Sequence, residues 1–332
     1  MTSMSEVLHI INTSRKALFG FAALIIYIFH GWKAVFLKTP LLFEAEYYTR
    51  ILGDVGVDIF LFLSGMGLIR SWRNCSSYKE FIERRFRRVL IPSVVAGIAF
   101  LIVHRHDPWH GIKAITGFYF FTGKLNMYLW FGFMIVLLYL FFPFYYELYA
   151  KARSKSIFTF TVIGLWLVLI YLLQGHVNDW SYICLNRIPV FLLGIYASHY
   201  CHTHEKVNPY LLYGGALVFF VAGLYLAFHI KMDGWHLLLP HSYALFPYMM
   251  MSISLVLLLS KLFMYLPHRI LDFYGLFTFE FYCVQERIFQ VFKHSFTEMP
   301  VLLRNVILLA IATICAYAVH QLNLIVWKWI KD

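Results

Sequence analysis

The sequence predicts an all-α, polytopic integral membrane protein with about ten transmembrane helices and both termini in the cytoplasm. Hydrophobic residues make up 61% of the 332 residues and charged residues only 14%, whereas charged residues make up about 25% of an ordinary soluble protein. Apolar runs of about 20 residues recur without the alternation expected of a β-barrel strand. Basic residues gather in short segments between these runs, as the positive-inside rule requires.

The order of the spans follows from the distribution of basic residues. A polar lead, 1–16, ends in Arg15 and Lys16 and is expected inside, and an outer loop is expected at 38–50. Segment 70–88 carries seven Lys and Arg residues and is also expected inside. The predicted spans are 17–37, 51–69, 89–103, 129–148, 157–173, 183–200, 210–230, 244–266, 275–291 and 303–326. The outer region 104–128 is expected to hold a partial helix at 115–121.

Charge and cysteine content narrow the expected partners. The net charge is +11 and the pI 9.3, but the positive residues lie mainly in the inner segments. The lipid bilayer is therefore the first expected partner, an anionic small molecule the second, and nucleic acid is not expected. The five cysteines are widely spaced and contain no Cys-x-x-Cys, so neither a disulfide framework nor a metal site is predicted.

Ionisable residues inside predicted spans are the first candidates for function, because each is costly in a membrane. His30 lies in the outer part of the first span, and Asp54 and Asp58 lie near the outer start of the second. Their positions in antiparallel spans predict that His30 and Asp58 lie at similar depth. This pair is suited to general base catalysis, with the carboxylate orienting the imidazole. The alternatives are a buried histidine bound to a backbone carbonyl and Asp54 as a helix cap.

Three blocks of sequence resemble the membrane-bound acyltransferase 3 family, which comprises integral membrane O-acyltransferases that modify bacterial surface glycans. The first is LFGFAALIIYIFH at 18–30, and the second is GVDIFLFLSGMGL at 56–68, followed by RRFRRVLIP at 84–92. A third, weaker block is spread over 129–143, 187–196 and 278–286. The resemblance implies that 1–332 forms a single transmembrane domain in the bacterial inner membrane and that His30 is catalytic.

Two positions depart from the family pattern. The family has an arginine eleven positions before the histidine, where this sequence has Phe19, and a late histidine where it has Gln285. Arg15 lies one turn before Phe19 on the same helix face and can extend toward the same depth. The departures are compatible with a divergent subgroup, an altered donor or acceptor, or an inactive relative.

The resemblance also implies a cytoplasmic acyl-coenzyme A donor, most simply acetyl-coenzyme A, and an acceptor that is a glycan or lipid-linked saccharide. Arginines at the inner side suit the phosphates of the donor, although a topology anchor facing anionic lipid explains them equally well. Arg187, in the outer part of its span, is expected either to assist catalysis or to pair with Glu280 or Glu286. The donor candidates are Arg15, Arg84, Arg85 and Arg88, and the acceptor candidates are Asp54, Trp109, Glu280 and Tyr282.

The sequence therefore predicts a membrane O-acyltransferase, most simply an O-acetyltransferase, with His30, Asp58 and Arg187 as its catalytic residues. A homodimer is a candidate assembly. The competing hypothesis is a transporter or flippase in which the same His, Asp and Arg residues form a proton or substrate relay.

Overall fold

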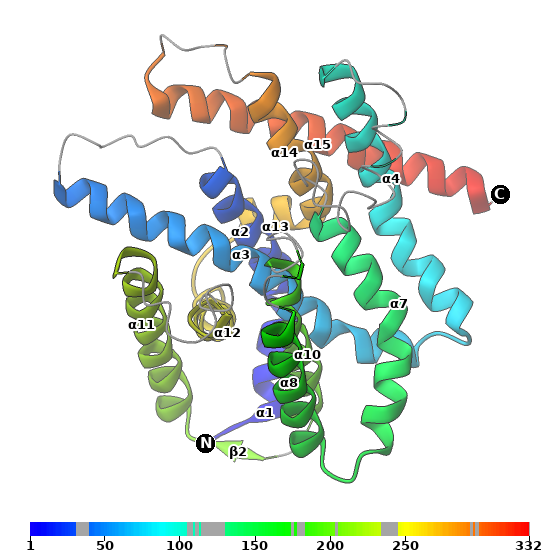
Figure 1. The fold of residues 1–332 in the computed structure, drawn as a ribbon, viewed down its shortest axis with the longest axis vertical. Helices are drawn as coiled ribbons and strands as arrows, with labels where there is room; N and C mark the ends of the chain where they lie inside the picture. Colours follow the sequence, from blue (N-terminus) through cyan, green and yellow to red (C-terminus); the bar gives the residue numbers. More distant parts are fainter. Residues whose placement is uncertain are drawn as a thin grey trace.

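The computed structural model describes residues 1–30, 40–104, 109, 113, 130–173, 176–177, 183–202, 205–233, 245–292, 295 and 299–331 (Figure 1). Its helices are α1 (Met4–Thr13), α2 (Arg15–His30), α3 (Pro40–Arg73), α4 (Tyr78–His104), α7 (Trp130–Lys151), α8 (Lys155–Leu172), α10 (Ile188–Tyr200), α11 (Pro209–Asp233), α12 (Leu245–Leu262), α13 (Arg269–Leu276), α14 (Thr278–Val291) and α15 (Val301–Lys331). The described residues thus form an all-α fold apart from two short strands. Five helices in this part of the chain are long and apolar enough to cross a membrane; ten spans with cytoplasmic termini stay a prediction.

Helix α3 forms much of the interior of the bundle. In an 18-residue window of its apolar stretch, Val55–Arg73, 72% of the residues are buried, compared with 17% in the corresponding windows of α8, α11 and α15. Figure 1 shows α11 and α7 on opposite sides of a centre that contains α2, α3 and α10. The outer helices expose many large apolar side chains, among them Leu165, Val218 and Ile314, which is the surface expected of helices that face lipid.

Small residues allow the central helices to approach closely. A methyl group at Gly65 of α3 would collide with the carbonyl of Phe191 in α10, and one at Gly194 of α10 would collide with the carbonyl of Phe62 in α3. Gly20 of α2 makes an equally close contact with α13. Contacts of this kind are typical of membrane helices, which associate through packing because lipid is as apolar as the side chains.

The N-terminal segment differs from the polar lead that the sequence predicts. It forms α1, whose Met4, Val7, Ile10 and Ile11 side chains are buried. The strands β1 (Thr2–Ser3) and β2 (Lys206–Val207) pair in antiparallel fashion. This pairing holds the N-terminus beside the segment that follows α10, so both lie at one end of the bundle, as the predicted topology requires.

Three predicted boundaries are wrong. The expected outer loop 38–50 is helical from Pro40 onward, because α3 begins there. The expected span 183–200 is broken: a single helical turn at 183–185 is followed by a turn at 186–187 and then by α10. The expected span 275–291 is likewise divided between α13 and α14, which meet at Phe277.

Candidate active site

Asp58 and Arg187 form an ion pair in the interior of the bundle. The distance from Arg187 Nη1 to Asp58 Oδ1 is 2.9 Å, and the two side chains are 11% and 3% exposed, respectively. The Arg187 guanidinium also lies 5.8 Å from the centre of the Trp130 ring at the start of α7. The pair joins α3 to the beginning of α10, and each charge is expensive to bury without the other.

The break before α10 explains how Arg187 reaches this position. Pro189 lies at the start of α10, and because proline lacks an N–H group it is tolerated in the first turn of a helix and disfavoured in its interior. The chain therefore restarts its helix here, with Arg187 in the turn just before it. The sequence suggested Glu280 or Glu286 as acidic partners for Arg187, and Asp58 takes that place instead.

His30 is the last residue of α2 and is partly buried. The register of α2 against α3 is set by Gly56, which faces Ala22 and Ile26, and by Gly53, which faces Ile25 and Phe29. Continuing this antiparallel register places His30 about 10 Å farther along the helix axes than Asp58. The prediction that His30 and Asp58 lie at similar depth is therefore wrong, and the Asp58 carboxylate accepts a hydrogen bond from Arg187.

Five aromatic side chains from α2, α3, α7 and α14 form a connected cluster. Phe19 of α2 stacks on Phe60 of α3, with 5.6 Å between ring centres. Phe60 lies 5.9 Å from Phe131 of α7, and Phe131 contacts both Phe279 and Tyr282 of α14. We call these residues the central aromatic cluster. Phe19, which replaces the arginine expected from the family pattern, thus has a packing role.

Arg15 lies over the ring of this same Phe19, at 5.3 Å from its centre. Its guanidinium donates a hydrogen bond to the carbonyl of Leu63 and packs on Gly67, where a Cβ would lie 2.6 Å from Nη2. Arg15 also lies close enough to Arg85, Arg88 and Tyr139 to interact with them electrostatically. We call these four residues the basic cluster. It gathers side chains from α2, α4 and α7 at the start of α2.

A family model described as an acyltransferase domain, that of the acyltransferase 3 family, matches residues 18–321, which is most of the chain. The chain belongs to the acyltransferase 3 family. The protein is therefore a membrane acyltransferase, and the transporter or flippase hypothesis loses its support. Comparison with curated proteins and with solved structures gave no significant match.

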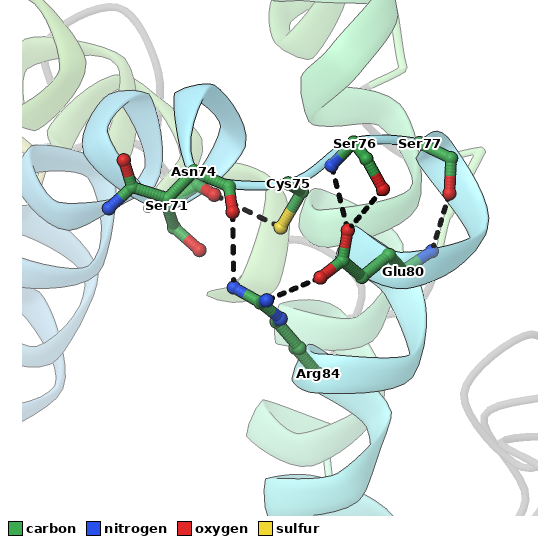
Figure 2. A network of polar contacts seen from close by, with 7 residues as sticks. All are labelled: Ser71, Asn74, Cys75, Ser76, Ser77, Glu80 and Arg84. Carbon is green, nitrogen blue, oxygen red and sulfur yellow. Dashed lines mark hydrogen bonds and ion pairs between the residues drawn. The ribbon is translucent and has the colours of Figure 1, made fainter.

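In this acyltransferase, Arg84 has a local role at the start of α4 (Figure 2). Its guanidinium binds the Glu80 carboxylate and donates a 3.3 Å hydrogen bond to the carbonyl of Asn74. Glu80 also accepts 2.7 Å hydrogen bonds from the backbone N–H and the hydroxyl of Ser76. These two bonds, and then the Arg84 charge, lower the pKa of Glu80. Arg84 thus fixes the α3–α4 turn, whereas Arg85 turns toward the rings of Phe81 and Tyr139.

Glu280 of the acyltransferase contacts two polar side chains of α15. Its Oε1 atom lies 2.9 Å from His320 Nδ1 and accepts a 3.4 Å hydrogen bond from Asn323 Nδ2. The predicted acceptor residue therefore joins α14 to α15. Sequence reasoning missed His320 and Asn323, although their spacing of three residues within an apolar span places them on one helix face.

The other sequence-predicted residues are placed as follows. Tyr282 is buried in the central aromatic cluster. Asp54 lies within α3, which begins at Pro40, and so does not cap a helix; its side chain lies outside the described residues. Trp109 is 59% exposed. Most of the residues around it in the sequence lie outside the described residues. The described residues contain no group of three His, Cys, Asp or Glu side chains arranged to bind a metal.

Proposed function

We propose that this protein transfers an acyl group, most simply acetyl, from cytoplasmic acyl-coenzyme A to a hydroxyl of a cell-surface or lipid-linked glycan in the bacterial inner membrane. The observation that carries the proposal is the position of two groups at opposite ends of α2. The basic cluster lies at Arg15 and His30 lies fifteen residues later, a separation of about 22 Å along the helix. A donor whose phosphates bind the basic cluster would extend along α2 and bring its thioester toward His30.

The basic cluster offers the chemistry that phosphates require. Guanidinium groups form short, charge-assisted hydrogen bonds with phosphate oxygens, and Arg15, Arg85 and Arg88 come together from two helices. Arg88 is exposed, whereas Arg15 and Arg85 are partly buried. We infer that these three arginines bind the phosphates of the donor nucleotide. Arg84 is not included, because it binds Glu80.

His30 acts as the general base in this proposal. Its imidazole removes the proton from the acceptor hydroxyl while that oxygen attacks the thioester carbonyl carbon. The carbon–sulfur bond then breaks, the new ester is released, and the leaving thiolate takes up the proton from the imidazolium to give coenzyme A. Asp58 acts through Arg187, because their ion pair fixes the start of α10 beside α3. Asp58 and Arg187 are therefore positioning residues, which act by holding α3 and α10 together.

The test of the proposal uses inverted membrane vesicles and radiolabelled acetyl-coenzyme A. Vesicles that contain the wild-type protein should transfer label to the glycan fraction and release an equal amount of coenzyme A. Arg15→Gln should raise the KM for acetyl-coenzyme A about 10- to 100-fold, because a hydrogen bond between charged groups contributes about 1.5–3 kcal/mol. Lys79→Gln is the control, since Lys79 is an exposed residue of α4 with an 87% exposed side chain. Equal label transfer with and without the protein would refute the proposal.

Gly67 offers a second, indirect test of the basic cluster. In Gly67→Ala the new methyl group would displace the Arg15 guanidinium, which is the flexible end of a side chain. We therefore expect little change in the melting temperature and an increase of about 10-fold in the Kd for coenzyme A, measured by calorimetry. The matched control is Gly164→Ala in α8, where a Cβ would have no atom within 4 Å. An unchanged Kd for coenzyme A in Gly67→Ala would show that Arg15 does not contribute to donor binding.

A further inference from the structure

Gln285 of α14 is a polar side chain buried without compensation. Its exposed fraction is 0%, and neither its Oε1 nor its Nε2 atom has a hydrogen-bond partner in the part of the chain that the structure describes. A buried amide without hydrogen-bond partners destabilises the folded protein, because it has lost its hydrogen bonds to water. Such groups are rare in folded proteins, and each one calls for a reason. A ligand that supplies the missing hydrogen bonds is one such reason.

The direction of the Gln285 side chain follows from its neighbours along α14. Phe281 and Phe289 both pack against the ring of Tyr27 in α2, with ring centres 5.9 and 4.9 Å apart, respectively. Gln285 lies four residues from each of them, so it shares their helix face and points toward α2. The Tyr27 hydroxyl donates a 2.6 Å hydrogen bond to the carbonyl of Asn305. The Gln285 amide therefore faces α2 at the level of Tyr27.

Along the axis of α2, the level of Tyr27 lies between the basic cluster and His30. Tyr27 is twelve residues after Arg15 and three residues before His30, or about 18 Å beyond the first and 4.5 Å short of the second. In a donor that binds at the basic cluster and reacts at His30, the part of the arm next to the thioester lies at this depth along α2.

We propose that Gln285 binds the amide of the pantetheine arm of the donor that lies nearest the thioester. Only two methylene groups separate that amide nitrogen from the sulfur, a length comparable to the rise from Tyr27 to His30. A carboxamide offers both a donor and an acceptor, which is the complement of a secondary amide. The inference rests on the proposed function, since it assumes that acyl-coenzyme A is the donor.

Binding of coenzyme A and of pantetheine to the purified protein tests this inference without any acceptor. Pantetheine keeps both amides but lacks the nucleotide. Gln285→Met, which removes the amide at similar volume, should raise the Kd for both compounds by the same factor, about 5- to 30-fold. Arg15→Gln should raise the Kd for coenzyme A alone. Gln285→Met should also raise the melting temperature, because it removes an uncompensated buried amide.

The remaining outcomes distinguish failure of the Gln285 inference from failure of the proposed acyl-coenzyme A donor. If the wild-type protein binds coenzyme A and Gln285→Met changes neither Kd, or changes only that of coenzyme A, Gln285 does not bind the arm. A lower melting temperature together with weaker binding would assign Gln285 a structural role and overturn the inference. If the wild-type protein binds no coenzyme A, the proposed donor is wrong and the inference fails with it.

Discussion

His30→Ala is expected to lower the rate of acyl transfer by about 10²- to 10⁴-fold, the usual contribution of a general base. The Kd for coenzyme A should stay unchanged, because the basic cluster lies about 22 Å away along α2. Label transfer from acetyl-coenzyme A measures the rate, and calorimetry with coenzyme A measures binding. This division between rate and binding distinguishes a reacting histidine from one that merely supports the fold.

A suitable control for this substitution is His9→Ala. His9 is an exposed residue of α1, so the same chemical change there should leave both quantities at their wild-type values. If His30→Ala transfers acyl groups at the wild-type rate, His30 is not the general base. A weaker affinity for coenzyme A, with the rate at saturation unchanged, would place His30 in donor binding.

Removal of one member of the Asp58–Arg187 pair should be strongly destabilising. Arg187→Met leaves the Asp58 carboxylate buried at 3% exposure without its cation, and loss of one partner of a buried pair costs about 3–5 kcal/mol. The double variant Asp58→Leu, Arg187→Met should recover most of that stability, because it removes both charges. Denaturant unfolding in detergent micelles measures the difference between the single and double variants.

Two further measurements complete this experiment: the acyl transfer rate of the double variant, and the stability after loss of an exposed ion pair. If the pair positions α10 for catalysis, the double variant should fold and still transfer acyl groups slowly. Glu83→Gln removes the partner of Lys79 in an exposed pair of α4 and should cost no more than about 1 kcal/mol. A double variant as unstable as Arg187→Met, or one with wild-type activity, would contradict the role assigned to the pair.

The class of the fold, the family and the candidate residues could be predicted from the sequence. Hydropathy and the distribution of Arg and Lys are local properties, so they identify apolar helices without any knowledge of their neighbours. The blocks at 18–30 and 56–68 pointed to the acyltransferase 3 family, and the family match over 18–321 confirms it. His30 and Arg187 stood out because ionisable residues in apolar helices are costly.

Which of these residues contact one another depends on the packing of the helices. Asp58 and Arg187 are separated by 129 positions, and no periodicity within either helix specifies such a contact. The depth of His30 relative to Asp58 depends on how Gly53 and Gly56 pack α3 against α2. The continuous hydropathy of 275–291 likewise does not specify the break at Phe277 between α13 and α14. The same is true of Gln285: the sequence shows a departure from the family pattern, and only the packing of α14 on Tyr27 turns that amide, buried and uncompensated, toward α2.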